Sequence, residues 1–184
     1  MDWKIVRSEY LFNDLWFTVR KDVCERPDGK IINPYYVYEF PTWVAAVAIT
    51  KDGKYIMVRQ YRHALGLTMY EIPGGCVDAD DKSIEEAVAR ELKEETGYEF
   101  GKYSYLGKIS ANPSTNNNWL HMYLATEGVK VSEQHLDDNE DLEVELFSLE
   151  DLKMLLMENR IIQSMHATAL FYALIKTGDL SFHS

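Results

Sequence analysis

The chain has 184 residues, of which 46% are hydrophobic and 12% aromatic, enough to bury the core of one globular domain with a small appendage. Its 30 acidic and 19 basic residues give a formal net charge of −11, which argues against long nucleic acids as partners. No stretch approaches the roughly 18 consecutive apolar residues of a membrane helix, and the N-terminus lacks the apolar segment of a signal peptide. We therefore expect a cytoplasmic protein that does not bind membranes.

The N-terminal part of the sequence is rich in aromatic and β-branched residues, which favour strands. Three such segments are found, at 4–12, 16–24 and 31–40, and the turn residues at 27–30 separate the last two. We predict a small antiparallel β region that forms an N-terminal extension over residues 1–41. The main domain is expected to span residues 42–184.

The main domain begins with a near-continuous apolar run at 43–50, as expected of a strand buried on both faces. A hairpin turn at 51–54 leads into a second strand at 55–60. Residues 66–69 are expected to form a loop that leads into Tyr70 and Glu71. Cys24 and Cys76 are too few and too far apart for a disulfide framework, and we interpret both as free thiols.

The most informative stretch is Glu71–Tyr98, which combines a strand end, two glycines, an acidic loop and a helix. Ser83 with Glu86 has the spacing of a capping box, and Gly97 supplies a stop, so we predict a helix over 83–96. At about 100° per residue, Glu91 and Glu95 lie on the apolar side of this helix.

Carboxylates on the core side of a helix need a positive partner, because burying them unpaired is costly. Glu94 lies on the flank of the same face. A hard divalent cation that prefers oxygen ligands, Mg²⁺ or Mn²⁺, is a suitable partner. The alternative is an ordinary solvated acidic face.

Residues 71–75 (EIPGG) together with 90–98 (RELKEETGY) resemble the signature of the Nudix hydrolases. The resemblance implies a Nudix-type α/β/α sandwich with a mixed central sheet, in addition to the N-terminal β region. It also implies structural roles for Gly75, Gly97 and Arg90, with Arg90 holding the carboxylates in place. The implied metal ligands are Glu91, Glu94, Glu95 and the main-chain carbonyl of Gly74.

One position departs from this signature. The glutamate expected just before the helix falls on Lys82, and the loop after Gly75 is one residue longer than the pattern. Asp81 is a possible replacement, so the number of bound metals is left open.

After the helix we expect strands at 103–110 and 119–126, joined by a polar loop at 112–118. Residues 127–145 are acidic, with a strand resuming at 142–147, and we interpret the part before it as a surface loop. Two helices follow, at 148–158 and 163–176. His166 lies among apolar residues of the second, and we interpret it as a packing or hydrogen-bonding residue.

Pro113 and the N-terminal strands resemble the ADP-ribose pyrophosphatase branch of the Nudix enzymes. This resemblance implies a homodimer formed through the N-terminal strands, which also cover the nucleotide base. Trp16 or Phe17 would then stack on adenine, although for each residue taken singly a place in the core or in the dimer interface is the more common role of an aromatic.

The same resemblance assigns further roles, again by matching position. Arg62 would contact the diphosphate of the substrate, with Arg59 as a weaker candidate, unless both only pair with surface carboxylates. Glu140 is the best match to the general base, with Asp138 and Glu143 as reserves, and Glu94 is placed with the catalytic residues as well. Asn118 stands where the branch usually has a glutamate, and it is a candidate to bind the substrate through a hydrogen bond to a ribose or base.

The function expected from these features is Mg²⁺-dependent hydrolysis of a small nucleotide, a nucleoside diphosphate linked to another group. ADP-ribose is favoured, with AMP and ribose 5-phosphate as products. Two alternatives remain open. The substrate could be a nucleotide sugar such as GDP-mannose or a dinucleotide such as NADH, or the protein could be a non-catalytic nucleotide-binding regulatory module.

Overall fold

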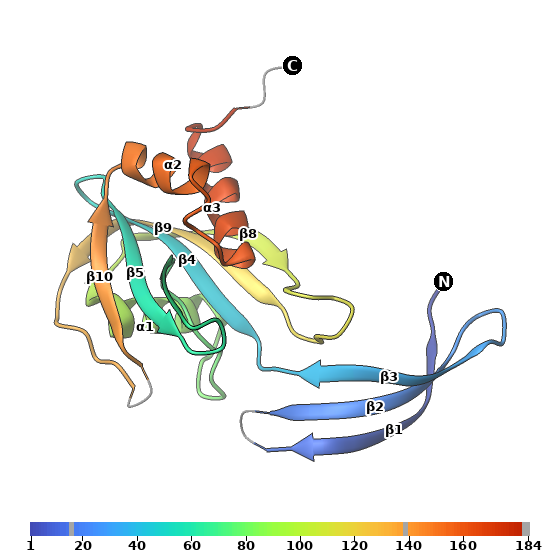
Figure 1. Cartoon of the computed structure of the whole chain (residues 1–184). Coiled ribbons are helices and arrows are strands. Elements are labelled where there is room, and N and C mark those ends of the chain that lie inside the picture. Colours follow the sequence, from blue (N-terminus) through green and yellow to red (C-terminus); the bar gives the residue numbers. More distant parts are fainter. Residues whose placement is uncertain (15–16, 138–139, 182–184) are drawn as a thin grey trace. The chain divides into compact units, whose positions relative to one another are not determined.

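The structure is a computed structural model that describes residues 1–14, 17–137 and 140–181 (Figure 1). The chain divides into two compact units. The N-terminal unit comprises Met1–Thr42 and Ser110–Trp119, and the main unit comprises Trp43–Ile109 and Leu120–Ser184. None of the described helices is both long and apolar enough to cross a membrane.

The N-terminal unit contains a three-stranded antiparallel sheet, which confirms the small β region predicted from the sequence. Its strands lie in the order β1 (Lys4–Asn13), β2 (Thr18–Glu25) and β3 (Ile31–Glu39). The segment Ser110–Trp119 belongs to this unit because it bonds to β3: Tyr38 N donates to Thr115 O (2.7 Å), and Asn117 N donates to Tyr38 O (3.2 Å). The boundary drawn at residues 41–42 did not include this distant segment.

The main unit is built on one seven-stranded mixed sheet. β4 and β9 pair in parallel, while the other neighbours pair antiparallel. The order is β10-β5-β4-β9-β7, with β6 pairing to β5 and β8 to β9. The strands are β4 (Trp43–Thr50), β5 (Tyr55–Arg62), β6 (Leu67–Glu71), β7 (Tyr98–Glu99), β8 (Lys102–Ile109), β9 (Leu120–Lys130) and β10 (Leu142–Phe147).

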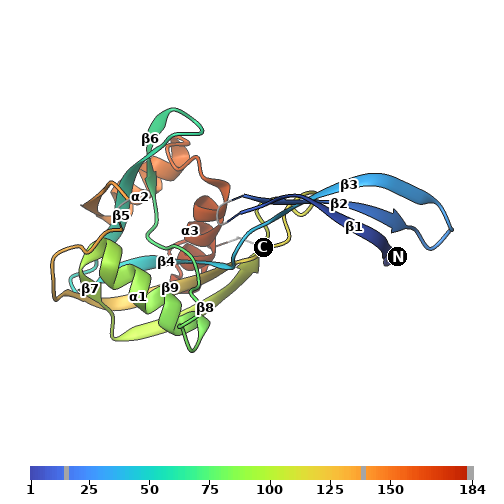
Figure 2. The same ribbon diagram turned by 90° about the horizontal axis from the view of Figure 1, so that it is seen from below.

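Helices cover both faces of this sheet. Figures 1 and 2 show α1 (Ile84–Thr96) on one face and α2 (Leu149–Met157) with α3 (Ser164–Thr177) on the other. The α/β/α sandwich is therefore confirmed. Because β4 is buried on both faces, its residues alternate between two hydrophobic cores: Ala45 and Val47 pack under α2 and α3, whereas Val44 and Ala46 pack against α1.

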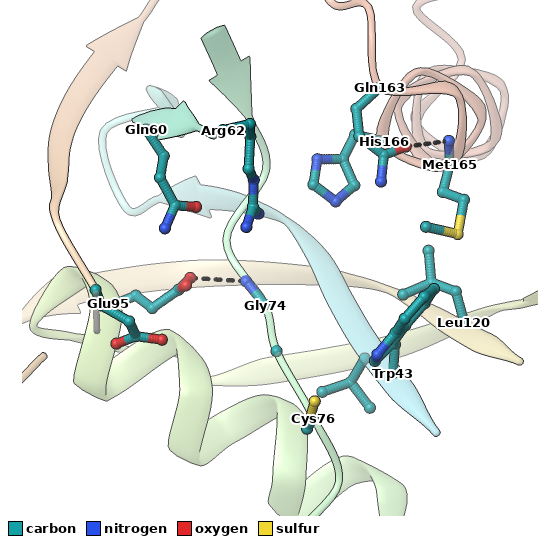
Figure 3. A pocket seen from close by; sticks show the side chains of 13 residues that line it. Trp43, Gln60, Arg62, Gly74, Cys76, Glu95, Leu120, Gln163, Met165 and His166 are labelled. Atoms are coloured by element: carbon teal, nitrogen blue, oxygen red, sulfur yellow. Dashed lines mark hydrogen bonds between the residues drawn. The ribbon is translucent and has the colours of Figure 1, made fainter. Parts of the chain in front are cut away.

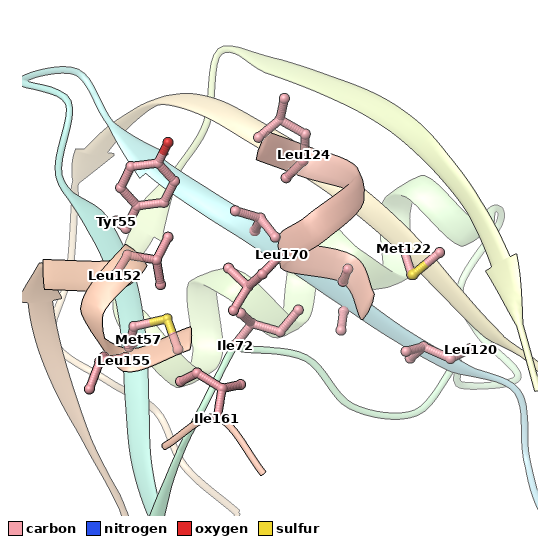
Figure 4. Packing of buried hydrophobic residues seen from close by; sticks show 14 residues of the cluster. Tyr55, Met57, Ile72, Leu120, Met122, Leu124, Leu152, Leu155, Ile161 and Leu170 are labelled. Atoms are coloured by element: carbon pink, nitrogen blue, oxygen red, sulfur yellow. The ribbon is translucent and has the colours of Figure 1, made fainter. Parts of the chain in front are cut away.

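The core under α2 and α3 is the larger of the two and is drawn in Figure 4. Leu152 and Leu170 project from the two helices and are fully buried there. On the opposite face, Val88 and Leu92 of α1 are equally buried. The sheet is thus fixed from both sides, and α1 has no freedom to rotate its carboxylates away.

The ends of α1 are set by local chemistry, as the sequence predicts. Ser83 Oγ accepts a hydrogen bond from Glu86 N (3.0 Å), and Gly97 ends the helix in the left-handed region at φ 76°. A cap also starts α2, where Ser148 and Asp151 bond each other reciprocally.

Two loop predictions are wrong. Leu67–Met69, expected in a loop, belongs to β6, because Gly66 at φ 67° reverses the chain and Leu67 pairs with Arg62 of β5. Residues 127–130, expected to start the acidic loop, extend β9 past an irregularity at Glu127 (φ 64°), and Val129 and Lys130 pair with the unexpected strand β7.

The buried face of α3 generates a stability prediction. Replacing Leu170, which is 0% exposed, with alanine removes a packed side chain from the larger core and should lower the free energy of unfolding by about 3 kcal/mol. The neighbouring Phe171→Ala, at a position 47% exposed, should cost less than about 1 kcal/mol. Urea denaturation of both variants measures the difference, and equal losses would contradict the packing of α3.

Candidate active site

A cavity of about 380 Å³ opens in the main unit where seven segments meet (Figure 3). They are the starts of β4, β9 and α3, the end of β5, the glycine loop, the C-terminal half of α1 and the acidic loop before β10. The residues that line it include Trp43, Gln60, Arg62, Gly74, Gly75, Glu95, Leu120, Glu140, Gln163, Met165 and His166.

The glycine loop is fixed against β4 by main-chain bonds. Ala46 N donates to Pro73 O (3.0 Å) and Val44 N donates to Gly75 O (2.9 Å). Gly74 lies at φ 152°, and a Cβ there would be 2.2 Å from Val44 O. A Cβ on Gly75 would lie 2.6 Å from the carboxylate of Glu91. Only glycine therefore allows β4, the loop and α1 to approach this closely.

The carboxylates of α1 point to this loop, as the helical phase predicts. Glu95 is 5% exposed, and its Oε2 accepts a hydrogen bond from Gly74 N (2.7 Å). Burial raises the pKa of Glu95 well above its ordinary value, and burial raises the pKa of Glu91 to about 7. Both side chains therefore lack enough nearby positive charge to favour the ionised form.

Arg90 gathers the acidic groups beside the cavity. It donates to Asp81 (3.1 and 3.0 Å), to Glu91 (3.1 Å) and to Glu94 (2.9 Å), and also to the carbonyl of Cys76 (2.9 Å). The hydrogen bonds with Asp81 are the main cause that raises the pKa of Arg90. Asp81, considered above as a replacement ligand, is thus bonded to Arg90.

The expected metal ligands lie together at one end of the site, but they do not form a finished metal cluster. Among residues 1–14, 17–137 and 140–181, no three His, Cys, Asp or Glu side chains are grouped closely enough to hold an ion as they stand. Arg90 holds Glu91 and Glu94, while the amide of Gly74 holds Glu95. Of these three glutamates, only Glu95 lines the cavity.

The donor set nevertheless fits a hard divalent cation. All candidate ligands offer oxygen, and two of the carboxylates are buried with raised pKa values, which an added positive charge would relieve. The carbonyls of Pro73 and Gly75 are engaged by β4, whereas no main-chain bond to the Gly74 carbonyl is found in the described part of the chain.

Arg62 reaches the cavity from the end of β5 and is held by Glu71. Its Nε and Nη2 donate to the two carboxylate oxygens at 3.0 and 2.5 Å, and Glu71 is only 1% exposed. The bond to Glu71 is the main cause that raises the pKa of Arg62. Glu71 therefore forms a buried ion pair with Arg62.

The remaining predicted residues fall in different places. Glu140 lines the cavity, and its charge contributes to the raised pKa of Glu91 and of Glu95 after their burial. Arg59 does not line the cavity and bonds Glu143 instead (3.3 Å). Asp138 and Trp16 lie outside the described residues.

Two candidates belong to the N-terminal unit. Phe17 is 46% exposed and packs against Phe12, with ring centroids 5.4 Å apart. Asn118 is 6% exposed and donates to Pro41 O (2.9 Å), while its Oδ1 has no hydrogen-bond partner within the described chain. Each keeps its predicted role only as a hypothesis.

The sequence did not point to the far wall of the cavity, where Gln163, Met165 and His166 lie at the start of α3. His166 was interpreted as packing or hydrogen-bonding, and it is buried on the inner face of the helix with Leu170 and Ala173. Its Nδ1 has no hydrogen-bond partner among the described residues. Burial lowers the pKa of His166 to about 4, so the ring is neutral near pH 7. The only signal in the sequence was a polar residue within an otherwise apolar helical face.

Comparison with known proteins places these features in a family. The model of the NUDIX domain matches residues 40–167, and that of the nucleoside diphosphate sugar hydrolase N-terminal domain matches residues 3–38. An ADP-ribose pyrophosphatase of Bacillus subtilis (strain 168) is 31% identical over 94% of this chain and 93% of its own.

Two further proteins are similar over nearly the whole length. A methanol dehydrogenase activator of Bacillus methanolicus is 30% identical over 92% of this chain and 91% of its own. The crystal structure of an ADP compounds hydrolase superposes with a TM-score of 0.83 at 25% identity, and the match covers 98% of each chain.

The depressed pKa of His166 generates a prediction for stability against pH. Between its usual value of 6.5 and about 4, the unfolded chain binds a proton that the folded protein does not, so this residue makes stability fall as pH falls. His166→Phe should remove that contribution. When the pH is lowered from 7.5 to 4.5, the free energy of unfolding of the variant should rise by about 2 kcal/mol relative to that of wild type.

Chemical denaturation of both proteins at the two pH values measures this gain. The comparison isolates His166, because the titrating carboxylates are present in both proteins. An unchanged difference in the free energy of unfolding would mean that His166 titrates normally.

Proposed function

The chain belongs to the Nudix family of hydrolases, and from that premise we propose that it cleaves the diphosphate of a nucleoside diphosphate linked to a second group. ADP-ribose is the favoured substrate, with AMP and ribose 5-phosphate as products. The observation that carries the proposal is the junction of Glu95 with Gly74 inside a cavity that also contains Arg62 and Glu140. The similarity to ADP-ribose pyrophosphatases over almost the whole chain supports this choice of substrate.

The residues that would hold a divalent cation are Glu91, Glu94, Glu95 and the Gly74 carbonyl, with Mg²⁺ or Mn²⁺ as the candidate ions. A cation bound there supplies positive charge to the diphosphate and makes a nearby water more acidic. The raised pKa values of the two buried glutamates support this assignment, because such carboxylates gain most from an added positive charge.

Arg62 is proposed to bind the oxygens of the diphosphate. Glu71 engages two of its N–H groups and fixes the plane of the guanidinium, while the rest of the five donors stay available to a ligand. Phosphate oxygens suit this geometry because the planar fork can bond two of them at once. Glu71 therefore acts as a positioning residue for Arg62.

Glu140 is proposed as the general base. It lies on the loop before β10 and lines the same cavity as Glu95 and Arg62. In its resting position its Oε2 accepts a hydrogen bond from Asp137 N (3.0 Å), so the side chain turns back on its own loop. A modest shift of this loop would direct the carboxylate to the attacking water, from which it takes a proton.

A regulatory role without hydrolysis is the alternative from a different class, and the similarity to a methanol dehydrogenase activator keeps it open. The two functions separate in one experiment. Hydrolysis requires release of a mononucleotide that depends on Mg²⁺ or Mn²⁺, whereas a purely regulatory module would bind ADP-ribose without turnover. A panel of ADP-ribose, GDP-mannose and NADH, with chromatography of the released mononucleotide, also identifies the substrate.

The role of Glu95 generates a direct test. Glu95→Gln keeps an oxygen that can accept the Gly74 N–H but removes the negative charge, so turnover should fall at least about 100-fold, corresponding to several kcal/mol of lost stabilisation. The control is Glu85→Gln on the exposed side of the same helix, which should keep wild-type activity. Unchanged circular dichroism with retained activity in Glu95→Gln would refute the assignment.

We further propose that the protein is a homodimer formed through the N-terminal strands. Every residue of β1 is exposed, and Val6 and Phe12 are each 58% exposed on this edge strand. Exposed apolar edge strands are generally covered in native proteins, and a second copy of the same strand is a simple cover.

The dimer is tested by size-exclusion chromatography with light scattering. Wild type should have twice the 21.3 kDa mass of one chain, and Val6→Glu should shift it to the monomer. Val131→Glu, at an exposed valine of the main unit, is the matched control and should remain dimeric. A monomeric wild type would overturn the proposal.

A further inference from the structure

The start of α3 contributes a wall of the cavity for which neither the metal nor the diphosphate accounts. Figure 3 shows Gln163 and His166 across the cavity from Glu95, with Arg62 at its upper edge. Both side chains are polar and lie beside the apolar residues Trp43, Leu120 and Met165. Cavities of this kind use a few polar groups among apolar ones to fix the orientation of a ligand.

His166 is the one residue of the main unit, in its described part, with a buried side-chain atom that makes no hydrogen bond. The residue is 8% exposed, and its Nδ1 lies 3.9 Å from Oε2 of Glu71, too far for a hydrogen bond. Nδ1 therefore faces the carboxylate of Glu71 without bonding it, which leaves Nε2 as the ring nitrogen available to a ligand in the cavity.

The surroundings of His166 favour one form of the ring. Glu71 accepts two bonds from Arg62 and also turns its Oε2 toward Nδ1, so this nitrogen is favoured as the one carrying hydrogen. In a neutral ring the other nitrogen, Nε2, is then a hydrogen-bond acceptor. The ring offers this acceptor because burial prevents it from being protonated near pH 7.

Gln163 supplies the complementary donor. Its Oε1 accepts a hydrogen bond from Met165 N (2.7 Å) and so caps the start of α3. This bond fixes which end of the amide is oxygen, and the NH₂ group has no hydrogen-bond partner among the described residues. A donor and an acceptor therefore stand together on the same wall.

A hydroxyl group matches this pair, because it donates one hydrogen bond and accepts others, whereas phosphate and carboxylate oxygens only accept. We propose that His166 and Gln163 form a subsite for a sugar hydroxyl and that His166 is a specificity-determining residue. The inference rests on the proposed function, since it describes how the same cavity selects its substrate. A nucleoside diphosphate joined to a sugar can bond both Gln163 and His166 through a sugar hydroxyl, whereas an apolar group in place of the sugar cannot.

The hydroxyl has two possible sources in such a substrate, the ribose of the nucleoside and the sugar beyond the diphosphate. The experiment separates them with two analogues of ADP-ribose. One carries 2′,3′-dideoxyadenosine and lacks the nucleoside hydroxyls, and the other is the β-methyl ester of ADP, which lacks the second sugar. Each is compared with ADP-ribose on wild type and on His166→Phe.

With wild type, loss of the recognised hydroxyl should lower kcat/KM about tenfold, because the polar wall is left unpaired. In His166→Phe, kcat/KM for the analogue that lacks the recognised hydroxyl should be within about twofold of kcat/KM for ADP-ribose. For the other analogue, the ratio of kcat/KM to that of ADP-ribose should be the same as in wild type. His166→Asn, whose side-chain oxygen can accept a hydrogen bond, should recover part of the discrimination. For each analogue, the measured ratio is kcat/KM for ADP-ribose divided by kcat/KM for the analogue. If neither ratio differs between wild type and His166→Phe, the subsite does not exist.

His121→Phe is the matched control. His121 lies on β9 outside the cavity, and its Nδ1 is within hydrogen-bond distance of the Tyr105 hydroxyl (3.1 Å), so both ratios should remain as in wild type. Stability supplies a second readout: His166→Phe should unfold at the same or a higher urea concentration at pH 7.5, because it removes an unpaired buried nitrogen. A large loss of stability with unchanged ratios would make His166 a purely structural residue.

Failure of the proposed function has a different signature. If wild type releases no mononucleotide from any of the three compounds, hydrolysis of ADP-ribose is refuted while the subsite is still tested. Calorimetric affinities for the same three compounds then replace kcat/KM, and the same comparison of ratios applies.

Discussion

The site depends on one hydrogen bond, from the main-chain N–H of Gly74 to the buried carboxylate of Glu95. A carboxylate that is 5% exposed needs a donor, and here the donor belongs to the loop that the helix faces. The bond holds only if the loop lies close to both neighbours, which requires glycine at 74 against Val44 of β4 and glycine at 75 against Glu91 of α1. Helix phase, loop composition and carboxylate position are thus one constraint, and changing any of them disturbs the other two.

Two arginines organise the acidic groups around this junction in different ways. Arg90 bonds carboxylates from the loop and the helix and keeps Glu94 and Glu91 beside the site. Among the residues that the structure describes, Arg62 bonds the buried Glu71 alone and presents the rest of its guanidinium to the cavity. In a chain with a net charge of −11, an anionic ligand meets favourable charge only where such a group is held in place.

How much the sequence predicts depends on whether the signal is local. The limits of α1 were predictable because Ser83 and Gly97 act within a few residues, and the inward phase of Glu91 and Glu95 follows from helical geometry alone. The strand β6 was missed because its polar and apolar residues do not alternate clearly, and its pairing with β5 decides its conformation. The placement of Ser110–Trp119 with β3 was equally invisible, since the bonds join residues far apart in the chain.

The same distinction explains which part of the site was found. The glycine loop and the glutamates are neighbours in sequence and form a signature, whereas the wall made by Gln163 and His166 enters the cavity only through the packing of α3 on the sheet. Ala169, Leu170 and Ala173 give α3 its burial, and they carry His166 inward with them. From the sequence alone, a histidine on that face is interpreted as a packing or hydrogen-bonding residue. Its place in the cavity follows only from the packing of α3 on the sheet beside Glu71.

The cavity and the adjoining part of α1 also contain the groups that burial leaves unfavourable. Glu91 and Glu95 have raised pKa values, His166 has a lowered one, and its Nδ1 is unpaired. Each of these lowers stability, and none is needed to close either hydrophobic core, because Leu92 and Leu170 do that from the same two helices. In sites that bind charged or polar ligands, the groups that stabilise the fold are commonly different from the groups that become paired only when the ligand binds. The buried polar groups are therefore best explained by what enters the cavity, since the packing around them would be stronger without them.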